Sequence, residues 1–262
     1  MKRSFVALAT ALLFAIPANA TDAQAVLAAP RQRVQSADFR ATGHLVRVDA
    51  NGVRTSYEIA IKAHWFPGVL RVLVETASAP RTGPDALVRA RMLTHILLEM
   101  RPNGQSMIRI AHPGDTAPAN LPFEKWSEGP LGAGFSYEDF LEPQYFWANQ
   151  TALEETRIGT RECDVLKSAP GASERTHYAE IQTWLAKGIG FPLYVEKTLK
   201  GSGVVKQFTY SGLRHEGGVW SAHQVEVKIH GQAGSTLLII DHGSAKANLS
   251  LKDFSPEQLT RF

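Results

Sequence analysis

The sequence contains little cysteine and, after its first residues, no long apolar run. Cys163 is the one cysteine among 262 residues, so an internal disulfide is excluded. It lies in a stretch of strand-like alternation, and we expect a buried, inert thiol because no base that would activate it is indicated. Beyond residue 20, no segment approaches the roughly 20 apolar residues of a membrane-spanning helix. We therefore do not expect an integral membrane protein.

Motifs of the common enzyme classes are missing as well. The chain has no G-x-S-x-G or S-x-x-K motif, no phosphate-binding loop and no dinucleotide fingerprint. None of its nine histidines forms H-E-x-x-H or pairs with cysteine at zinc-site spacing. We therefore expect no catalysis, no metal and no cofactor, although catalytic groups that are distant in sequence leave no such motif.

Excess charge of one sign is also scarce. The net charge is +3, and removal of Lys2 and Arg3 leaves +1 (3 − 2) with no acidic residue lost. Basic and acidic residues are interspersed and form no block, so nucleic acid is not an expected partner.

The first 20 residues have the three regions of a secretory signal peptide. Met1-Lys2-Arg3 is basic, residues 4–16 are almost wholly apolar, and Ala18-Asn19-Ala20 is a small-residue cleavage site. Cleavage leaves Thr21 first, whereas a bacterial lipoprotein needs cysteine there. We expect a periplasmic protein that is exported without a lipid anchor.

The mature chain reads as a short lead-in followed by one β domain. Residues 21–37 are alanine-rich and then basic, which indicates a loose or partly helical segment. From residue 38 to 262 apolar residues recur with a period of two, and Gly- or Pro-containing turns separate the runs. This pattern predicts an antiparallel meander, with its last strand near residues 245–251.

One stretch, residues 132–141, interrupts the alternation with a helix start. Ser136 is a suitable N-cap, and Asp139, three residues on, completes a capping box. Phe135 and Phe140 occupy the two positions of a hydrophobic staple, and Pro143 keeps the helix short. A similar start recurs at the C-terminus, where Ser255 precedes Pro256 and Gln258 completes the box.

The region around this start carries six aromatic residues between positions 135 and 147. They favour two interpretations, a connector packed on the core or a lid over an apolar cavity. On residue patterns alone the connector is favoured, but one short segment cannot easily bury six aromatics on one face. The candidate cavity or lid residues are Phe135, Tyr137, Phe140, Leu141, Tyr145 and Trp147.

The run Phe-Ser-Tyr-Glu-Asp at residues 135–139 resembles the GTDFSYEDL-type segment of LolA-like outer-membrane lipoprotein-sorting proteins. The sequence departs from that segment at Ala133, Gly134 and Phe140. The resemblance extends from about residue 38 to the C-terminus. It implies a mainly β fold: a large curved antiparallel sheet forming an open LolA/LolB-like half-barrel, with short helices covering its mouth.

The same resemblance implies a periplasmic carrier. Such a protein binds the acyl chains of a lipoprotein or lipid in a hydrophobic cavity for transfer toward the outer membrane. An inner-membrane export complex and an outer-membrane acceptor are the implied partners. The alternative is a ligand-sensing or interaction module on the same fold, and an enzyme acting on an amphipathic substrate is the weakest reading.

We expect N-terminal sequencing of the protein from a periplasmic fraction to begin at Thr21, because the small-residue cleavage site ends at Ala20. Recovery of a product that retains residues 1–20, or of a lipid-modified one, would contradict this prediction.

Overall fold

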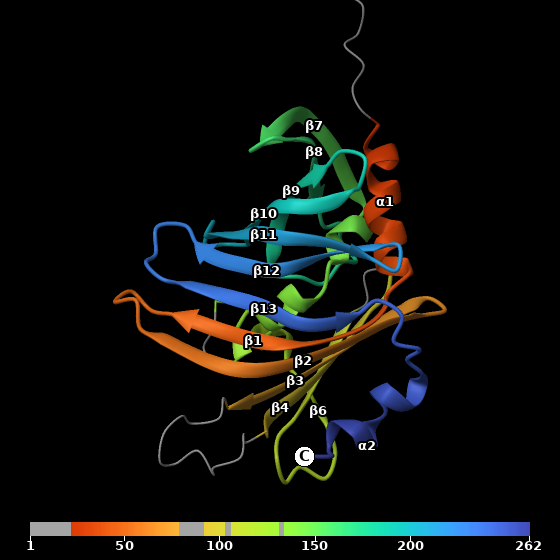
Figure 1. Cartoon of the computed structure of the whole chain (residues 1–262), viewed down its shortest axis with the longest axis vertical. Helices are drawn as coiled ribbons and strands as arrows, with labels where there is room; N and C mark the ends of the chain where they lie inside the picture. The colour runs from red at the N-terminus through yellow and green to blue at the C-terminus, as the bar shows by residue number, and fades with distance from the viewer. Residues whose placement is uncertain (1–21, 79–91, 103–105, 131–133) are drawn as a thin grey trace, which may run out of the picture.

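The computed structural model describes residues 22–78, 92–102, 106–130 and 134–262. The proposed signal peptide and Thr21 lie outside these residues. Within them, one antiparallel sheet of thirteen strands dominates the molecule, and α-helices and 3-10 helices are few and short (Figure 1).

The strands follow the alternating runs of the sequence. Their bounds are β1 Asp38–Val48, β2 Arg54–Phe66, β3 Val69–Ser78, β4 Met92–Met100, β5 Ser106–Ala111, β6 Ala119–Asn120, β7 Asn149–Ile158, β8 Arg161–Ala169, β9 Tyr178–Ala186, β10 Phe191–Leu199, β11 Val205–Glu216, β12 Val219–Ile229 and β13 Ser235–Ser244. The helices are α1 Ala23–Gln35, η1 Phe123–Lys125, η3 Tyr137–Phe140, η4 Pro143–Phe146, η5 Leu251–Phe254 and α2 Pro256–Leu259.

The order of strands across the sheet is β6-β5-β4-β3-β2-β1-β13-β12-β11-β10-β9-β8-β7. Two meanders, β1–β6 and β7–β13, are therefore joined by the pairing of β1 with β13. The edge strands are β6 and β7, so the sheet is not closed into a barrel. Because these edge strands are consecutive in the chain, the connection at residues 121–148 has to pass from one edge of the sheet to the other.

The distribution of buried apolar residues shows that the sheet is curved. Ile108 of β5 and Leu166 of β8 stand near opposite edges of the sheet, yet they belong to one buried cluster with residues of almost every strand between them. Alternate residues of a strand point to opposite faces, and in β3 Val72 and Val74 join this cluster while Leu73 does not. The concave face of a half-barrel is thus the main core, as the sequence predicts.

Gly43 marks an irregularity in the central pairing. The register between β1 and β13 shifts between Thr42 and Gly43. A Cβ atom at Gly43 would lie 1.9 Å from the carbonyl oxygen of Ile239, so only glycine permits this close approach of the two backbones.

Most of the segment expected to be a loose or partly helical lead-in forms helix α1, which contains Pro30. The Asp22 carboxylate caps it by accepting from the backbone N–H of Gln24 at 2.9 Å. Leu27 and Val34 are buried in the main core, and α1 contacts β7, β8 and η4. Tertiary packing, rather than helix propensity, stabilises this segment.

The C-terminal segment differs from its prediction in two respects. No strand forms over residues 245–251, because both edges of β13 are already paired, with β1 and β12. Instead the Asp38 carboxylate accepts from the backbone N–H groups of Asn248 and Leu249, at 3.0 Å each.

The second difference concerns the caps. Ser255 is the N-cap of α2, with Pro256 in its first turn, but its side chain makes no capping hydrogen bond. The second capping box is formed by Ser250 and Asp253 at η5 instead.

Helix α2 does not cover the mouth of the half-barrel. Phe254 and Leu259 form a separate cluster with Leu73 and Leu97, which point away from the concave face. The concave side is covered by α1 and by the connection that holds η3 and η4.

We predict that Leu27→Ala lowers the free energy of unfolding by about 2–5 kcal/mol, because Leu27 is fully buried in the main core and its truncation leaves a cavity. The control is Val53→Ala, at an apolar residue that is 60% exposed, with an expected change below about 0.5 kcal/mol. Urea unfolding of both variants measures this, and equal effects would mean that α1 is not part of the core.

Candidate ligand-binding site

Helix η3 is built by its own capping box, as the sequence predicts. The backbone N–H of Ser136 donates to the Asp139 carboxylate at 2.8 Å, and the Ser136 hydroxyl donates to the same oxygen at 2.7 Å. The rings of Phe135 and Phe140 lie 4.8 Å apart, as expected for the staple. The helix is a single 3-10 turn, and Leu141 after it is already extended.

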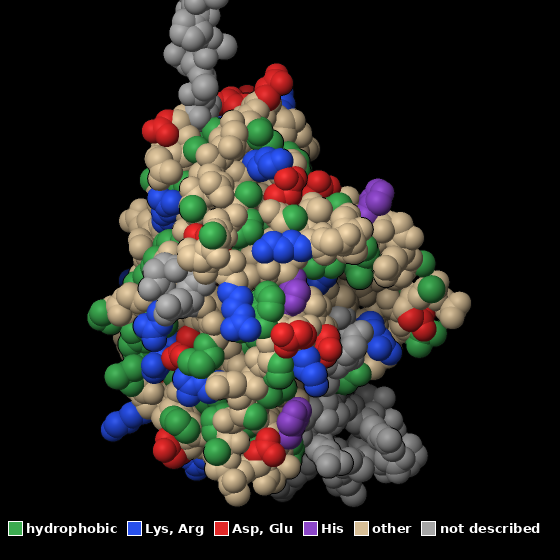
Figure 2. Space-filling view, turned by 180° about the vertical axis from the view of Figure 1, so that it is seen from behind, with side chains coloured by type: hydrophobic (Ala, Val, Ile, Leu, Met, Phe, Trp, Pro, Cys, Tyr) green, Lys and Arg blue, Asp and Glu red, His purple; other side chains and the backbone are tan. Residues whose placement is uncertain are grey.

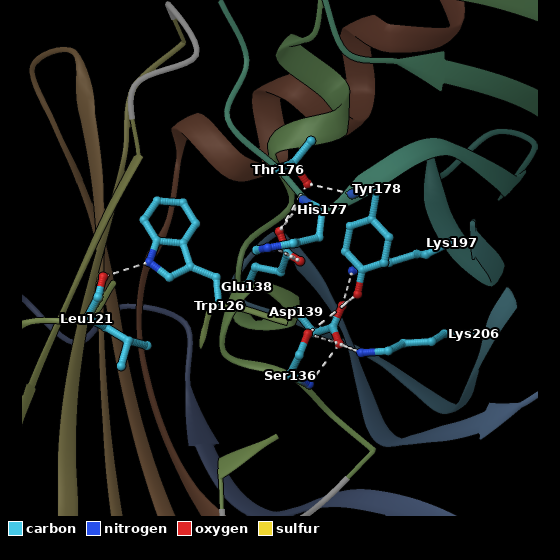
Figure 3. Close-up of polar contacts among 10 residues, drawn as sticks. All are labelled: Leu121, Trp126, Ser136, Glu138, Asp139, Thr176, His177, Tyr178, Lys197 and Lys206. Carbon is cyan, nitrogen blue, oxygen red and sulfur yellow. Dashed lines mark hydrogen bonds and ion pairs between the residues drawn. The ribbon is translucent and has the colours of Figure 1, made fainter. Parts of the chain in front are cut away.

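Asp139 is more than a capping residue. Its carboxylate is completely buried, and the ammonium groups of Lys197 and Lys206 lie 2.8 and 3.1 Å from its two oxygens (Figure 3). The hydroxyl of Tyr178 donates to it at 2.7 Å. One carboxylate from the connection is thus held by three side chains from β9, β10 and β11.

The protonation states of Asp139 and Tyr178 follow from this geometry. Burial opposes ionisation of Asp139, but the charges of Lys197 and Lys206 outweigh burial and hold the pKa of the carboxyl well below its ordinary value. Burial, followed by the neighbouring charge of Asp139, raises the pKa of Tyr178 well above 10.0, so this tyrosine is neutral and donates. In this cluster Asp139 is therefore the ionised carboxylate and Tyr178 a neutral donor.

Glu138, the neighbour of Asp139, attaches η3 to the two residues that precede β9. Its carboxylate accepts from the Thr176 hydroxyl at 3.0 Å and lies 3.3 Å from the Nδ1 atom of His177. The His177 ring in turn stacks on Phe123 of η1, with ring centroids 4.1 Å apart. Figure 3 shows Glu138 and Asp139 turned toward different partners.

The six predicted cavity or lid residues come together on the concave face. Phe135, Leu141, Tyr145 and Trp147 are buried in the main core, while Tyr137 and Phe140 are half-buried and pack against it. Gly134 of the glycine pair is fixed, because its N–H donates to the Thr236 hydroxyl at 2.9 Å; Gly132 and Ala133 lie outside the described residues. The connection therefore fills the concave face with its own side chains, and a ligand role for the six residues stays a prediction.

A second polar cluster joins α1 to η4. The Arg33 guanidinium pairs with Glu142 at 2.8 Å and lies 5.2 Å above the Phe191 ring. Arg31 donates to the carbonyl oxygen of Tyr145 at 2.7 Å. The Tyr145 side chain is fully buried, and burial raises the pKa of its hydroxyl.

Lys197, Lys206 and Tyr178 were not identified from the sequence. The alternation of the strands does contain a hint. Each lysine lies two residues from an apolar residue whose side chain faces the core, Val195 in β10 and Phe208 in β11, so the lysine side chain faces the core as well. A lysine at such a position needs a buried partner. Its partner is distant in sequence, so the pairing cannot be read from local patterns.

The expected burial of Cys163 is observed. Cys163 is buried in a small cluster with Ala186 and Leu193, and burial raises the pKa of its thiol. Across the described ranges, no three His, Cys, Asp or Glu side chains are grouped to hold a metal ion, and none of the helices there is long and apolar enough to cross a membrane. Figure 2 shows basic and acidic side chains interspersed on one face of the molecule.

A protein-family model described as an uncharacterized protein matches residues 124–261, more than half of the chain. The chain belongs to that family. The matched region begins within η1 and includes η3, Tyr178 and both buried lysines. A comparison with curated proteins gives no match.

Solved structures share the fold over nearly the whole chain. A domain from Vibrio parahaemolyticus, described as an outer membrane lipoprotein-sorting protein domain, has 19% identity and a TM-score of 0.75 and covers 92% of this chain and 100% of its own. A DUF1329 family protein from Desulfovibrio piger has 16% identity and a TM-score of 0.73, with coverage of 90% and 98%. A LolA superfamily protein from Nitrosomonas europaea has 14% identity and a TM-score of 0.63, with coverage of 90% and 99%. The LolA-like fold expected from the Phe135–Asp139 run is thus confirmed.

We predict that Asp139→Asn lowers the free energy of unfolding by about 3–5 kcal/mol, because it leaves two buried lysines without a counter-charge. Asp253→Asn is the matched control. It weakens the same kind of capping box at η5 by removing the charge of the acceptor, where no buried lysine takes part, and should cost at most about 1 kcal/mol. Equal losses in denaturant unfolding would mean that the ion pairs contribute nothing beyond the cap.

The stability difference between wild type and Asp139→Asn should also depend on pH. A carboxyl with a depressed folded-state pKa contributes stability that is complete above the unfolded pKa of about 3.9 and is lost as the pH falls toward the folded value. Below about pH 4 the difference should therefore shrink by about 1.4 kcal/mol per pH unit. Denaturant unfolding between neutral pH and pH 3 measures it, and a constant difference would contradict the assigned ionisation.

Proposed function

We propose that this protein is a periplasmic carrier that binds the acyl chains of a lipoprotein or lipid on the concave face of its half-barrel. One observation carries the proposal: a LolA-like half-barrel whose concave face is lined by apolar side chains from nearly every strand. Binding and hand-over proceed without bond breaking. The Sec-type signal pattern of residues 1–20 supports a periplasmic location.

The physical requirement for such a carrier is shielding. An acyl chain exposed to water costs about 0.8 kcal/mol per methylene group, so transit through the periplasm needs an apolar surface that replaces the membrane. In the structure the connection occupies that surface with Phe135, Leu141, Tyr145 and Trp147. An acyl chain takes their place against the sheet when the connection moves outward.

The edge-to-edge path of the connection suits this exchange. Its described residues hold to the sheet through a few polar contacts, chiefly those of Asp139, Glu138 and Gly134, and otherwise through apolar packing that an acyl chain can replace. An inner-membrane complex that loads the carrier and an outer-membrane acceptor are the partners that this function requires.

We expect native mass spectrometry of the mature protein to detect a co-purified lipid, and the protein to bind a fluorescent fatty acid. Phe140→Asp should weaken that binding about tenfold or more, because a charge at the edge of the apolar face is poorly tolerated next to an acyl chain. Phe140 is half-buried, so the change can be made without emptying the core.

The control is Leu251→Asp on η5, which adds the same charge at a residue that is 58% exposed; it should bind as wild type does. Thermal melts of both variants verify folding. Absence of fatty-acid and lipid binding in the wild type would contradict the carrier function. Unchanged binding by folded Phe140→Asp would show that Phe140 is not part of the binding site.

A further inference from the structure

Lys197 and Lys206 are placed in an arrangement that a sheet normally avoids. They are direct partners in the register of β10 and β11 and point to the same face. Like charges directly opposite each other destabilise a strand pair. Here both side chains are in addition buried, each with about 5% of its surface exposed, where an unpaired ammonium group is most costly.

The surroundings of the pair are apolar. Across the strands the row continues with Ile181 on β9 and Ile229 on β12. The Lys197 ammonium lies 4.5 Å from the centre of the Phe208 ring and 5.3 Å from that of Tyr178. Two cations thus stand side by side within the surface that we propose for acyl chains.

A purely structural role does not need two lysines. Both lysines face the single carboxylate of Asp139, whereas the neighbouring buried carboxylate of Glu138 contacts Thr176 and His177. Buried ion pairs contribute little to stability compared with apolar packing, so a stabilising role is a weak explanation for an additional buried cation. The arrangement is that of a built anion site in which a carboxylate of the chain itself is the occupant.

We propose that Lys197 and Lys206 bind the anionic group, carboxylate or phosphate, of the amphiphile carried by the half-barrel, and that Asp139 occupies this site when no ligand is bound. The proposal rests on the carrier function and adds the chemical class of the cargo. When an anion replaces Asp139, the buried lysines keep a counter-charge. A neutral amphiphile would leave them unpaired, so the exchange selects for negative charge.

The test compares ligands that differ only in the polar end. Displacement of N-phenylnaphthylamine, a neutral fluorescent probe, is measured for hexadecanoate against hexadecanol, and for phosphatidylglycerol against diacylglycerol with the same chains, at mildly alkaline pH. We expect the wild type to bind at least one anionic form about tenfold more tightly than its neutral counterpart, as charge-assisted hydrogen bonds predict. Which pair shows the preference distinguishes a carboxylate from a phosphate.

Lys206→Met should abolish this preference while retaining the one-to-one pair of Asp139 and Lys197, which favours folding. Lys228→Met is the control, because this lysine on β12 is 57% exposed, and it should keep the full preference. If folded Lys206→Met still binds the anionic ligand more tightly than the neutral one, the proposed anion site is wrong.

If Lys206→Met does not fold, Asp139→Asn supplies a second measurement. The anionic ligand should raise its melting temperature more than the neutral one does, because the unpaired lysines regain a counter-charge, and equal shifts would overturn the proposal. Failure of the anion site and failure of the carrier are distinguishable. Equal binding of both ligand forms by the wild type overturns the anion site alone, whereas binding of neither overturns both.

Discussion

The ion pairs of Asp139 with Lys197 and Lys206 are the interaction that fixes the connection on the concave face. The connection between the two edges of the sheet has to cross the open side of the half-barrel, and apolar contacts alone leave its position adjustable. A buried carboxylate with two ammonium partners has one geometry and a large penalty for leaving it unsatisfied. This cluster therefore fixes where η3 lies and, through η3, which aromatic side chains fill the concave face.

The topology explains why such a fixed point is needed. The two meanders meet at β1 and β13 and end at β6 and β7, so neither edge closes against the other. The concave face is protected by α1 from one side and by the connection from the other. The connection and α1 thus shield the apolar side chains of the concave face from water.

Much of the fold could be predicted from the sequence because its signals are local. Period-two alternation and Gly-containing turns located most strands, and the Ser136–Asp139 box and the Phe135–Phe140 staple formed as their spacing indicates. Two of the departures from prediction have non-local causes. A strand at residues 245–251 matches the local pattern, but it follows β13, which is already paired on both sides, and α1 is ordered by the core it covers.

The candidate site, too, could be predicted from the sequence only in its local features. The sequence by itself determined that a short aromatic segment interrupts a β domain, that Asp139 caps its helix, and that the segment resembles LolA-like proteins. Only the tertiary structure decided that Asp139 meets Lys197 and Lys206, 58 and 67 residues further along the chain. The physical reason is that capping and periodicity act over a few residues, whereas partners for a buried charge are chosen by strand register and by the path of the connection across the sheet.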